Sequence, residues 1–359
     1  MSKIIAISTG VPRYKYKQAE IFEFINHFNN IAEKDYKKIK LLFERSGIET
    51  RYSVLDSFDS TKEDSFFSAT RIPDVEERME IYLREATALS KNVIEDCLSN
   101  ELETDKITHL ITVSCTGLSA PGIDIALIKE VGLKPDIHRS AVNFMGCYAA
   151  VHALKQADYI CNSDPEAKVL IICVELCSLH YQKQNDMETI AANLLFADGA
   201  AAALVCNDKY PQKGLRLNHF YSYVSIEGEK EMAWNLSAKG FLMTLSAYIP
   251  QLIEKGIKSL TEEVLVKFNI SSKDILGWAI HPGGRKILEV IQKELSLESK
   301  DLEASYNVLK NYGNMSSPTI LFVIKKCWEQ LASTPNAKIF GAAFGPGLTM
   351  ESFLLENKL

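Results

Sequence analysis

The chain has 359 residues, of which 47% are hydrophobic and 24% are charged, the composition of an ordinary globular protein. This length exceeds that of a usual single core, so we expect two domains or two fused halves. A net charge of −6 argues against nucleic acid as the main partner. No apolar run approaches the length that spans a membrane.

The eight cysteines favour a reducing compartment. No two of them form a C-x-x-C pair, and no His/Cys cluster has the spacing of a zinc site. Several lie in apolar, strand-like runs, which suits the cytoplasm better than a disulfide framework. Residues 1–10 hold too short an apolar run for a signal peptide and predict a first strand. We therefore expect a cytoplasmic protein without a metal site.

Apolar patterns predict strands and helices in alternation. The first half is expected to hold a strand at 1–10, helices at 18–45 and 71–98, a strand at 107–113, a helix ending near 131, a strand ending at 144, a helix from 147, and strands at 168–174 and 200–205. Residues 207–233 are polar and irregular, and we place the boundary between the halves there, dividing the chain into 1–210 and 211–359.

The second half is expected to hold a helix at 242–268, a strand at 275–280, helices from 285 and at 315–331, and a closing pair of strands within 339–355. Pro250 predicts a kink or a break in the first of these helices. The alternation of strands and helices along the whole chain indicates an α/β fold.

A candidate nucleophile lies where a strand turns into a helix. Residues 141–144 end the strand, Gly146 breaks it, and a helical pattern begins at Cys147. A helix N-terminus exposes N–H groups and positive partial charge, which favours the thiolate form of a cysteine. The alternative is a buried structural cysteine, because free cysteines are among the most buried residues.

Two further residues could complete a catalytic set. His281 stands between an apolar strand and Pro282-Gly-Gly284, and Asn314 lies just before a predicted helix. Taken singly, the first fits a structural histidine at a strand end and the second fits a helix cap. Together with Cys147 they form a Cys/His/Asn set, whose members need to be close only in the fold.

Five stretches of the chain resemble the signatures of type III polyketide synthases, the chalcone synthase-like enzymes. They occur in the order of that family and span most of the chain. The resemblance implies a thiolase-type fold of two similar halves, layered αβαβα, and a homodimer. The stretches are Asn143-Phe-Met-Gly-Cys-Tyr-Ala149, Leu195-Phe-Ala-Asp-Gly-Ala-Ala-Ala202, His281-Pro-Gly-Gly284, Tyr312-Gly-Asn-Met-Ser-Ser317 and Phe344-Gly-Pro-Gly-Leu-Thr-Met-Glu351.

The resemblance also implies roles for the Cys/His/Asn set. Cys147 matches the nucleophile that carries the acyl group of a CoA-linked starter. His281 matches the imidazolium that pairs with its thiolate. His281 and Asn314 match the donors to the malonyl-CoA thioester carbonyl, where charge develops as CO2 leaves. CoA thioesters are then the substrates, and no metal, nucleotide or flavin cofactor is implied.

Other matched positions concern the cavity and its entrance. Phe196 matches the phenylalanine between the acyl site and the CoA tunnel, and Glu175 and Ser316 match polar cavity positions. Lys38 and Arg45 match contacts to CoA phosphates. Each has a plainer alternative: a core aromatic, a satisfied buried carboxylate, a first-turn helix serine, and a solvated helix face.

Several positions depart from the plant enzymes and argue against a chalcone-type product. The departures replace three threonines, a methionine that reaches into the partner subunit's cavity, a glycine and a second phenylalanine. In the same order, they are Cys115, Cys177 and His180, then Ala120, Trp234 and Met243. Separately, Leu41 stands where the family has a further basic CoA contact, for which Lys40 is the expected substitute.

Two other functions would fit part of this pattern. A ketoacyl synthase of fatty-acid type would share the fold and the Cys/His/Asn set but take malonyl groups from acyl carrier protein; Phe196 and the run that starts at Phe344 argue against it. A non-catalytic scaffold subunit is disfavoured because Cys147, His281 and Asn314 are all present. The expected function is therefore iterative condensation of malonyl-CoA onto a starter carried by Cys147.

Overall fold

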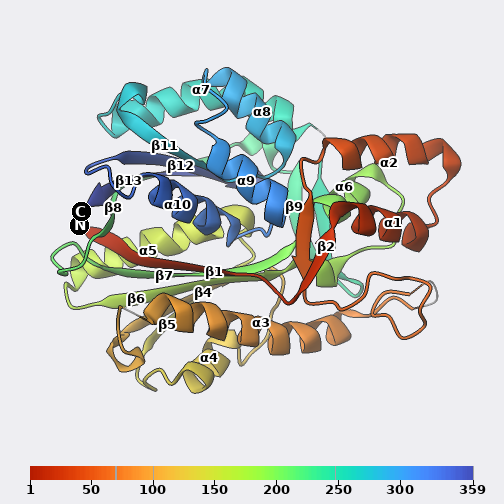
Figure 1. Cartoon of the computed structure of the whole chain (residues 1–359), viewed down its shortest axis with the longest axis horizontal. Coiled ribbons are helices and arrows are strands. Elements are labelled where there is room, and N and C mark those ends of the chain that lie inside the picture. The colour runs from red at the N-terminus through yellow and green to blue at the C-terminus, as the bar shows by residue number, and fades with distance from the viewer. Residues whose placement is uncertain (69–70, 100, 247, 359) are drawn as a thin grey trace.

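The computed structural model describes residues 1–68, 71–99, 101–246 and 248–358 (Figure 1). The strands are β1 (Ser2–Gly10), β2 (Tyr14–Lys17), β3 (Thr50–Ser53), β4 (His109–Ser114), β5 (His138–Asn143), β6 (Lys168–Leu176), β7 (Asp198–Asn207), β8 (Gly214–Val224), β9 (Met232–Ser237), β10 (Gly240–Leu245), β11 (Ile275–Ile280), β12 (Lys338–Gly345) and β13 (Thr349–Lys358). The α-helices are α1 (Gln18–Asn29), α2 (Glu33–Arg45), α3 (Val75–Leu98), α4 (Ile123–Val131), α5 (Ala149–Ser163), α6 (Met187–Leu195), α7 (Ile249–Lys267), α8 (Arg285–Glu294), α9 (Glu303–Tyr312) and α10 (Thr319–Gln330).

One nine-stranded sheet forms the frame, in the order β11-β12-β13-β8-β1-β7-β6-β4-β5. Its two parts are joined where Ser2–Ile4 of β1 pair with Leu215–Leu217 of β8. In Figure 1 these parts lie in separate layers, with α5 and α10 between them, α3 and α4 below, and α7 and α8 above. This arrangement confirms the predicted αβαβα layering.

The two halves repeat one strand order. In the first half β1 pairs with β7, β7 with β6, and β6 with β4; in the second, β8 pairs with β13, β13 with β12, and β12 with β11. The first two pairings are antiparallel and the third is parallel in each half. Within the described residues, the outer strand β5 has no counterpart in the second half. The fold is thus two similar halves, as the resemblance implied.

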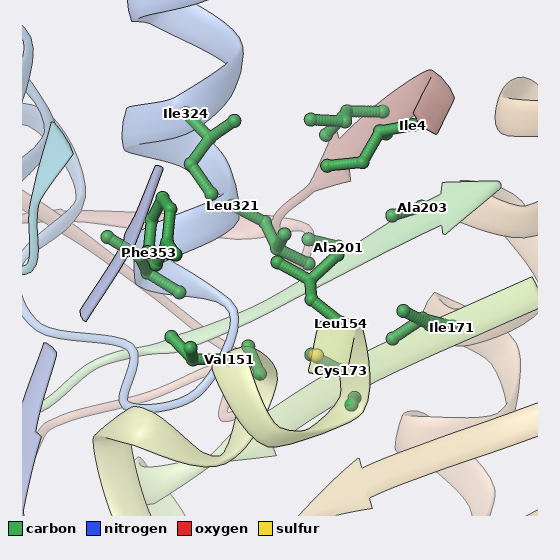
Figure 2. Close-up of a cluster of buried hydrophobic side chains, with 14 of the residues drawn as sticks. Ile4, Val151, Leu154, Ile171, Cys173, Ala201, Ala203, Leu321, Ile324 and Phe353 are labelled. Carbon is green, nitrogen blue, oxygen red and sulfur yellow. The ribbon is translucent and has the colours of Figure 1, made fainter. Parts of the chain in front are cut away.

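The central core lies between the two parts of the sheet (Figure 2). Apolar side chains of α5 and α10 are fully buried against the strands, and fully burying a side chain of this size contributes about 1.5–3 kcal/mol. Alanines on both α5 and β7 let the helix approach the sheet closely. The labelled residues are Ile4, Val151, Leu154, Ile171, Cys173, Ala201, Ala203, Leu321, Ile324 and Phe353.

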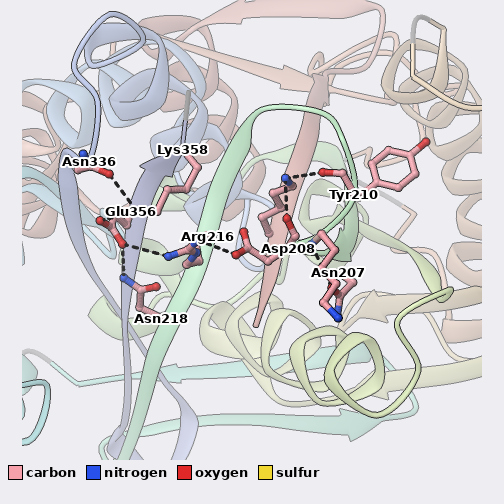
Figure 3. Close-up of polar contacts among 10 residues, drawn as sticks. Asn207, Asp208, Tyr210, Arg216, Asn218, Asn336, Glu356 and Lys358 are labelled. Atoms are coloured by element: carbon pink, nitrogen blue, oxygen red, sulfur yellow. Dashed lines mark hydrogen bonds and ion pairs between the residues drawn. The ribbon is translucent and has the colours of Figure 1, made fainter.

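Polar contacts tie segments near the two chain ends together (Figure 3). Arg216 on β8 lies 2.6 Å from the carboxylate of Asp208 and 3.9 Å from that of Glu356. Because β1 and β13 both pair with β8, the two termini lie side by side.

Two predicted helices were wrong in extent, and the kink or break expected at Pro250 was also wrong. Residues 18–45 form two helices, because the chain turns at Asn30, which takes the left-handed conformation. Residues 242–268 begin as strand β10 before α7 starts at Ile249. Pro250 lies in the first turn of α7, where its missing N–H breaks no helical bond, so it causes neither kink nor break.

The region expected to be irregular, 207–233, contains β8, which lies inside the main sheet. Only the start of β8 is buried, and its second half carries exposed polar and aromatic side chains, so its sequence lacks an apolar run. The short strands β2, β3 and β9, and the helices α6 and α9, were also not predicted.

Candidate active site

The turn that carries Cys147 packs closely against residues 345 and 346. Cys147 follows Gly146, whose φ of +78° favours glycine. A Cβ at Gly146 would come within 2.3 Å of Pro346, and one at Gly345 would come within 3.3 Å of the Cys147 nitrogen. The glycine-rich loop after β12 therefore packs directly on the turn that begins α5, which joins the second half of the chain to the nucleophile.

The turn that carries Asn314 lies on the other side of the thiol. Gly313 ends α9 with a φ of +71°. The Asn314 Oδ1 accepts a hydrogen bond from the Ser316 N–H at 2.8 Å. The amide oxygen and nitrogen of Asn314 lie 3.9 and 4.0 Å from the Cys147 Sγ. The bond from Ser316 orients the amide so that its NH2 group, which donates toward the Cys147 Sγ, can also donate to a ligand beside the sulfur.

His281 follows β11 and is fully buried. Its backbone N–H donates to the Ala342 carbonyl at 2.8 Å, which fixes the strand end. Both ring nitrogens lack a hydrogen-bond partner among the described residues, and burial lowers the pKa of the imidazole to about 3. An unpaired buried imidazole is costly, which is a feature expected of a functional group rather than of a structural one.

Burial also dominates the chemistry of the thiol. It raises the pKa of Cys147 to about 11, although hydrogen bonds from Ser316 and Asn314 oppose the shift. Burial therefore opposes the effect that the helix N-terminus is expected to have on the pKa of this thiol. A base that can take the thiol proton is needed, and the pairing of His281 with this thiol remains a prediction.

A cavity of about 260 Å³ opens beside the thiol and is lined by both halves. Cys147, Cys177, Ala192 and Phe196 pack together on one side of it. Nine of the residues predicted for the site line this cavity: Cys115, Cys147, Cys177, His180, Phe196, Trp234, Met243, Asn314 and Ser316.

The β9–β10 hairpin forms one wall of the cavity. Trp234 lies directly across the hairpin from Met243, and both line the cavity. The Trp234 indole N–H donates to the Cys115 carbonyl at 2.6 Å. This bond holds the hairpin against the loop that follows β4.

His180 is a neutral part of the same wall. Its Nε2 lies 2.7 Å from the Thr116 carbonyl, and its Nδ1 accepts the Phe241 N–H at 3.2 Å. Burial lowers the pKa of this imidazole to about 3. Phe241, which was not among the predicted site residues, stacks on the ring at 4.3 Å. Phe241 directly precedes the segment expected to be helical, and the sequence around it carries no clear alternation that would have signalled a strand.

Glu175 lies behind the cavity rather than in its lining. Its carboxylate accepts hydrogen bonds from the Cys115 N–H and the Thr116 hydroxyl, both at 2.8 Å, and from the Ser317 hydroxyl at 2.6 Å. Burial raises its pKa, and these donors oppose the shift. Glu175 therefore braces the loop that carries Cys115 and the turn that carries Ser316, and it does not face the cavity.

Lys38 and Arg45 lie on the exposed surface of α2 and not in the cavity. They are seven residues apart and so share one helix face, with the 44% exposed Leu41 between them. Among the described residues, no cluster of His, Cys, Asp and Glu side chains is suited to hold a metal ion. In the same part of the chain, no helix combines the length and apolar character needed to cross a membrane.

Comparison with known proteins agrees with this geometry. Residues 1–209 match the N-terminal domain of chalcone and stilbene synthases, and residues 221–358 match the C-terminal domain. The chain is 31% identical to the Mycobacterium tuberculosis protein described as "Alpha-pyrone synthesis polyketide synthase-like Pks18", over 98% of this chain and 90% of that protein.

Solved structures give the same answer. PKS-I from the brown alga Ectocarpus siliculosus superposes with a TM-score of 0.93, at 27% identity, covering 99% of this chain and 98% of that one. The 1,3,6,8-tetrahydroxynaphthalene synthase of Streptomyces coelicolor, a bacterial type III polyketide synthase, has a TM-score of 0.90 at 27% identity, with 99% of both chains covered. The fold, the cavity and these matches show that the chain belongs to the chalcone and stilbene synthase family and is a type III polyketide synthase.

Proposed function

We propose that this acyltransferase condenses malonyl-CoA with an acyl group held as a thioester on Cys147. The observation that carries the proposal is the placement of the Asn314 amide 3.9–4.0 Å from the Cys147 Sγ, inside a cavity that both residues line. A donor at this distance leaves room for a carbonyl group beside the sulfur.

In the loading step, Cys147 attacks the thioester carbonyl of an acyl-CoA. The thiol proton passes to the imidazole of His281, whose ring nitrogens have no other partner among the described residues. The bond from the carbonyl carbon to the CoA sulfur breaks, CoA leaves as its thiolate and takes a proton from solvent, His281 keeps the thiol proton, and the acyl group stays on Cys147.

In the extension step, malonyl-CoA places its thioester carbonyl against the NH2 group of Asn314 and the protonated His281. The bond to the carboxylate breaks, CO2 leaves, and the electron pair forms an enolate whose oxygen those donors stabilise. The enolate carbon then attacks the acyl group on Cys147, and the cysteine leaves as thiolate. This scheme needs no metal or organic cofactor.

An exposed helix face and the volume of the cavity support further parts of the proposal. Lys38 and Arg45 share one exposed face of α2 and would bind the phosphates of CoA. The cavity of about 260 Å³ lies below the range usual for ligand sites, about 300–1,000 Å³, so we infer a small starter or an aliphatic chain.

We also propose a homodimer that works in the cytoplasm. The outer strand β5 ends the sheet and exposes most of its residues, and Leu118 and Ile125 beside it are 49% and 42% exposed. Such an edge is suited to pairing with a second copy. The eight free cysteines fit a reducing compartment.

Two substitutions separate the steps of the reaction. Cys147→Ala should abolish the mass gain that the protein shows after mixing with acyl-CoA. Asn314→Ala should still gain the acyl mass but release CO2 from malonyl-CoA about 10²–10³ times more slowly, because one oxyanion donor is lost.

The matched controls are Cys327→Ala and Asn357→Ala, which alter a buried cysteine and a buried asparagine that do not line the cavity. Both controls should keep loading and decarboxylation. Normal product formation by Cys147→Ala, or normal CO2 release by Asn314→Ala, would remove that residue from its role.

A further inference from the structure

Arg51 is a buried cation that the reaction scheme leaves unused. It lies on β3 with only 2% of its surface exposed. Its Nη1 donates to the Asn193 carbonyl at 2.9 Å and also to the Phe196 carbonyl. Asn193 belongs to the last turn of α6, where carbonyl groups lack helical partners and negative partial charge accumulates. The guanidinium therefore closes this helix end.

The segment that Arg51 holds is the one that positions Asn314. The Asn314 N–H donates to the Leu195 carbonyl at 3.1 Å, and the Ala197 N–H donates to the Asn314 carbonyl at 2.9 Å. A Cβ at Gly313 would lie 3.0 Å from Cγ and Cδ of Arg51. Arg51 thus contacts both paired segments. Its guanidinium binds carbonyls of residues 193 and 196, and its aliphatic carbons pack against Gly313.

Residues 49, 50 and 52, in or next to β3, contact the stretch that leads into Asn314. The Glu49 N–H donates to the Lys310 carbonyl at 2.8 Å, and the Thr50 hydroxyl donates to the Asn311 carbonyl at 2.7 Å. The Tyr52 ring stacks on Tyr312 at 5.9 Å. Four consecutive residues, 49–52, therefore contact the stretch 310–313 that leads into Asn314.

We propose that Arg51 is a positioning residue for decarboxylation, acting through Asn314. This inference rests on the proposed role of Asn314. Cys147 lies before α5 and His281 lies after β11, and Arg51 hydrogen-bonds to neither, so loading should depend on Arg51 less than decarboxylation does. A displacement of about 1 Å at a reacting group costs roughly 10²-fold in rate, so a small shift of the Asn314 turn would slow decarboxylation selectively.

The test compares two rates in the intact enzyme: CO2 release from malonyl-CoA and acyl loading measured by mass. Arg51→Met keeps the apolar stem and loses the donors, so the first rate should fall roughly tenfold to a hundredfold relative to the second. Arg51→Lys keeps a cation but loses the planar guanidinium, so its rate of CO2 release should fall less. Should the methionine variant not fold, the lysine variant carries the same comparison.

Arg216→Met is the matched control, because Arg216 binds two carboxylates (Figure 3) and does not line the cavity. It should lower the melting temperature without changing the ratio of the two rates. If Arg51→Met lowers both rates in parallel with the folded fraction, Arg51 is only structural and the inference is overturned.

A double-substitution cycle shows whether Arg51 acts through Asn314. Adding Arg51→Met to Asn314→Ala should slow CO2 release no further, since the donor that Arg51 positions is already absent. If the double variant instead releases CO2 at a rate reduced by the product of the two separate effects, the inference is overturned and the role of Asn314 stays intact. Normal CO2 release by Asn314→Ala alone would instead overturn the proposed function.

Discussion

Two buried imidazoles differ in their hydrogen bonding. His180 uses both ring nitrogens, one toward the Thr116 carbonyl and one toward the Phe241 N–H. His281 uses neither among the described residues. Burial disfavours the charged form of both, yet only His281 has nitrogens available for a proton from a thiol or a bond to a substrate. The contrast supports a structural role for His180 and the proposed reactive role of His281.

The depressed pKa of His180 predicts a pH dependence of stability. A histidine whose folded pKa is about 3 and whose unfolded pKa is about 6.5 contributes stability that is present above pH 6.5 and is lost as the pH falls toward 3. Between pH 7 and pH 5 this loss is about 2 kcal/mol. His180→Gln should reduce the pH dependence of the unfolding free energy by about that amount, measured by urea unfolding at both pH values. An identical pH dependence in variant and wild type would contradict the assignment.

At the residue scale, the proposed nucleophile and its amide partner could be singled out from the sequence because each follows a glycine near the end of a strand or helix. Cys147 follows Gly146, and Asn314 follows Gly313. Which side of the cavity wall a residue faces could not be named, because that depends on packing across segments. Glu175 lies near the end of the buried strand β6, yet three donors from other segments hold it behind the wall.

At the element scale, the β9–β10 hairpin decides the shape of the cavity. Its residues carry neither a continuous apolar run nor a clear alternation, so its strands could not be told from loop and helix. The central strands β6 and β7 were predictable because burial on both faces requires a continuous apolar sequence. The hairpin forms only a two-stranded sheet, and it is held by contacts such as the Trp234 bond to Cys115.

This placement predicts that Trp234 restricts the starter. Trp234→Gly removes an indole from the cavity wall and breaks the bond to the Cys115 carbonyl, so bulkier aromatic starters should be accepted or longer products formed. The melting temperature should fall by about a few degrees, since a hydrogen bond is worth about 1 kcal/mol. Product profiles from a panel of acyl-CoAs test this. Trp328→Ala, on α10 outside the cavity, should lower stability alone. An unchanged product profile in Trp234→Gly would show that the indole does not limit the substrate.

At the scale of the whole molecule, the two edge strands of the sheet differ in their exposure to solvent. The end strand β11 is buried at all but one of its residues, whereas β5 at the other end is exposed at all but one. A cavity-forming loop, 117–125, lies beside β5. Because exposed strand edges invite pairing, this asymmetry favours β5 over β11 as the interface of the proposed dimer.

The dimer can therefore be broken at one strand. Ala141 is exposed on β5, and Ala141→Arg would place a charge where a second copy should pack. We expect the wild-type protein to show the mass of two 40.2 kDa chains in light scattering after size exclusion, and the variant to show the mass of one. The melting temperature of the wild type should rise with protein concentration, because association stabilises the folded chain. Val266→Arg on α7, at a residue 78% exposed, adds the same charge away from β5 and should remain dimeric. A wild-type monomer, or an Ala141→Arg variant that stays dimeric, would place the interface elsewhere or exclude it.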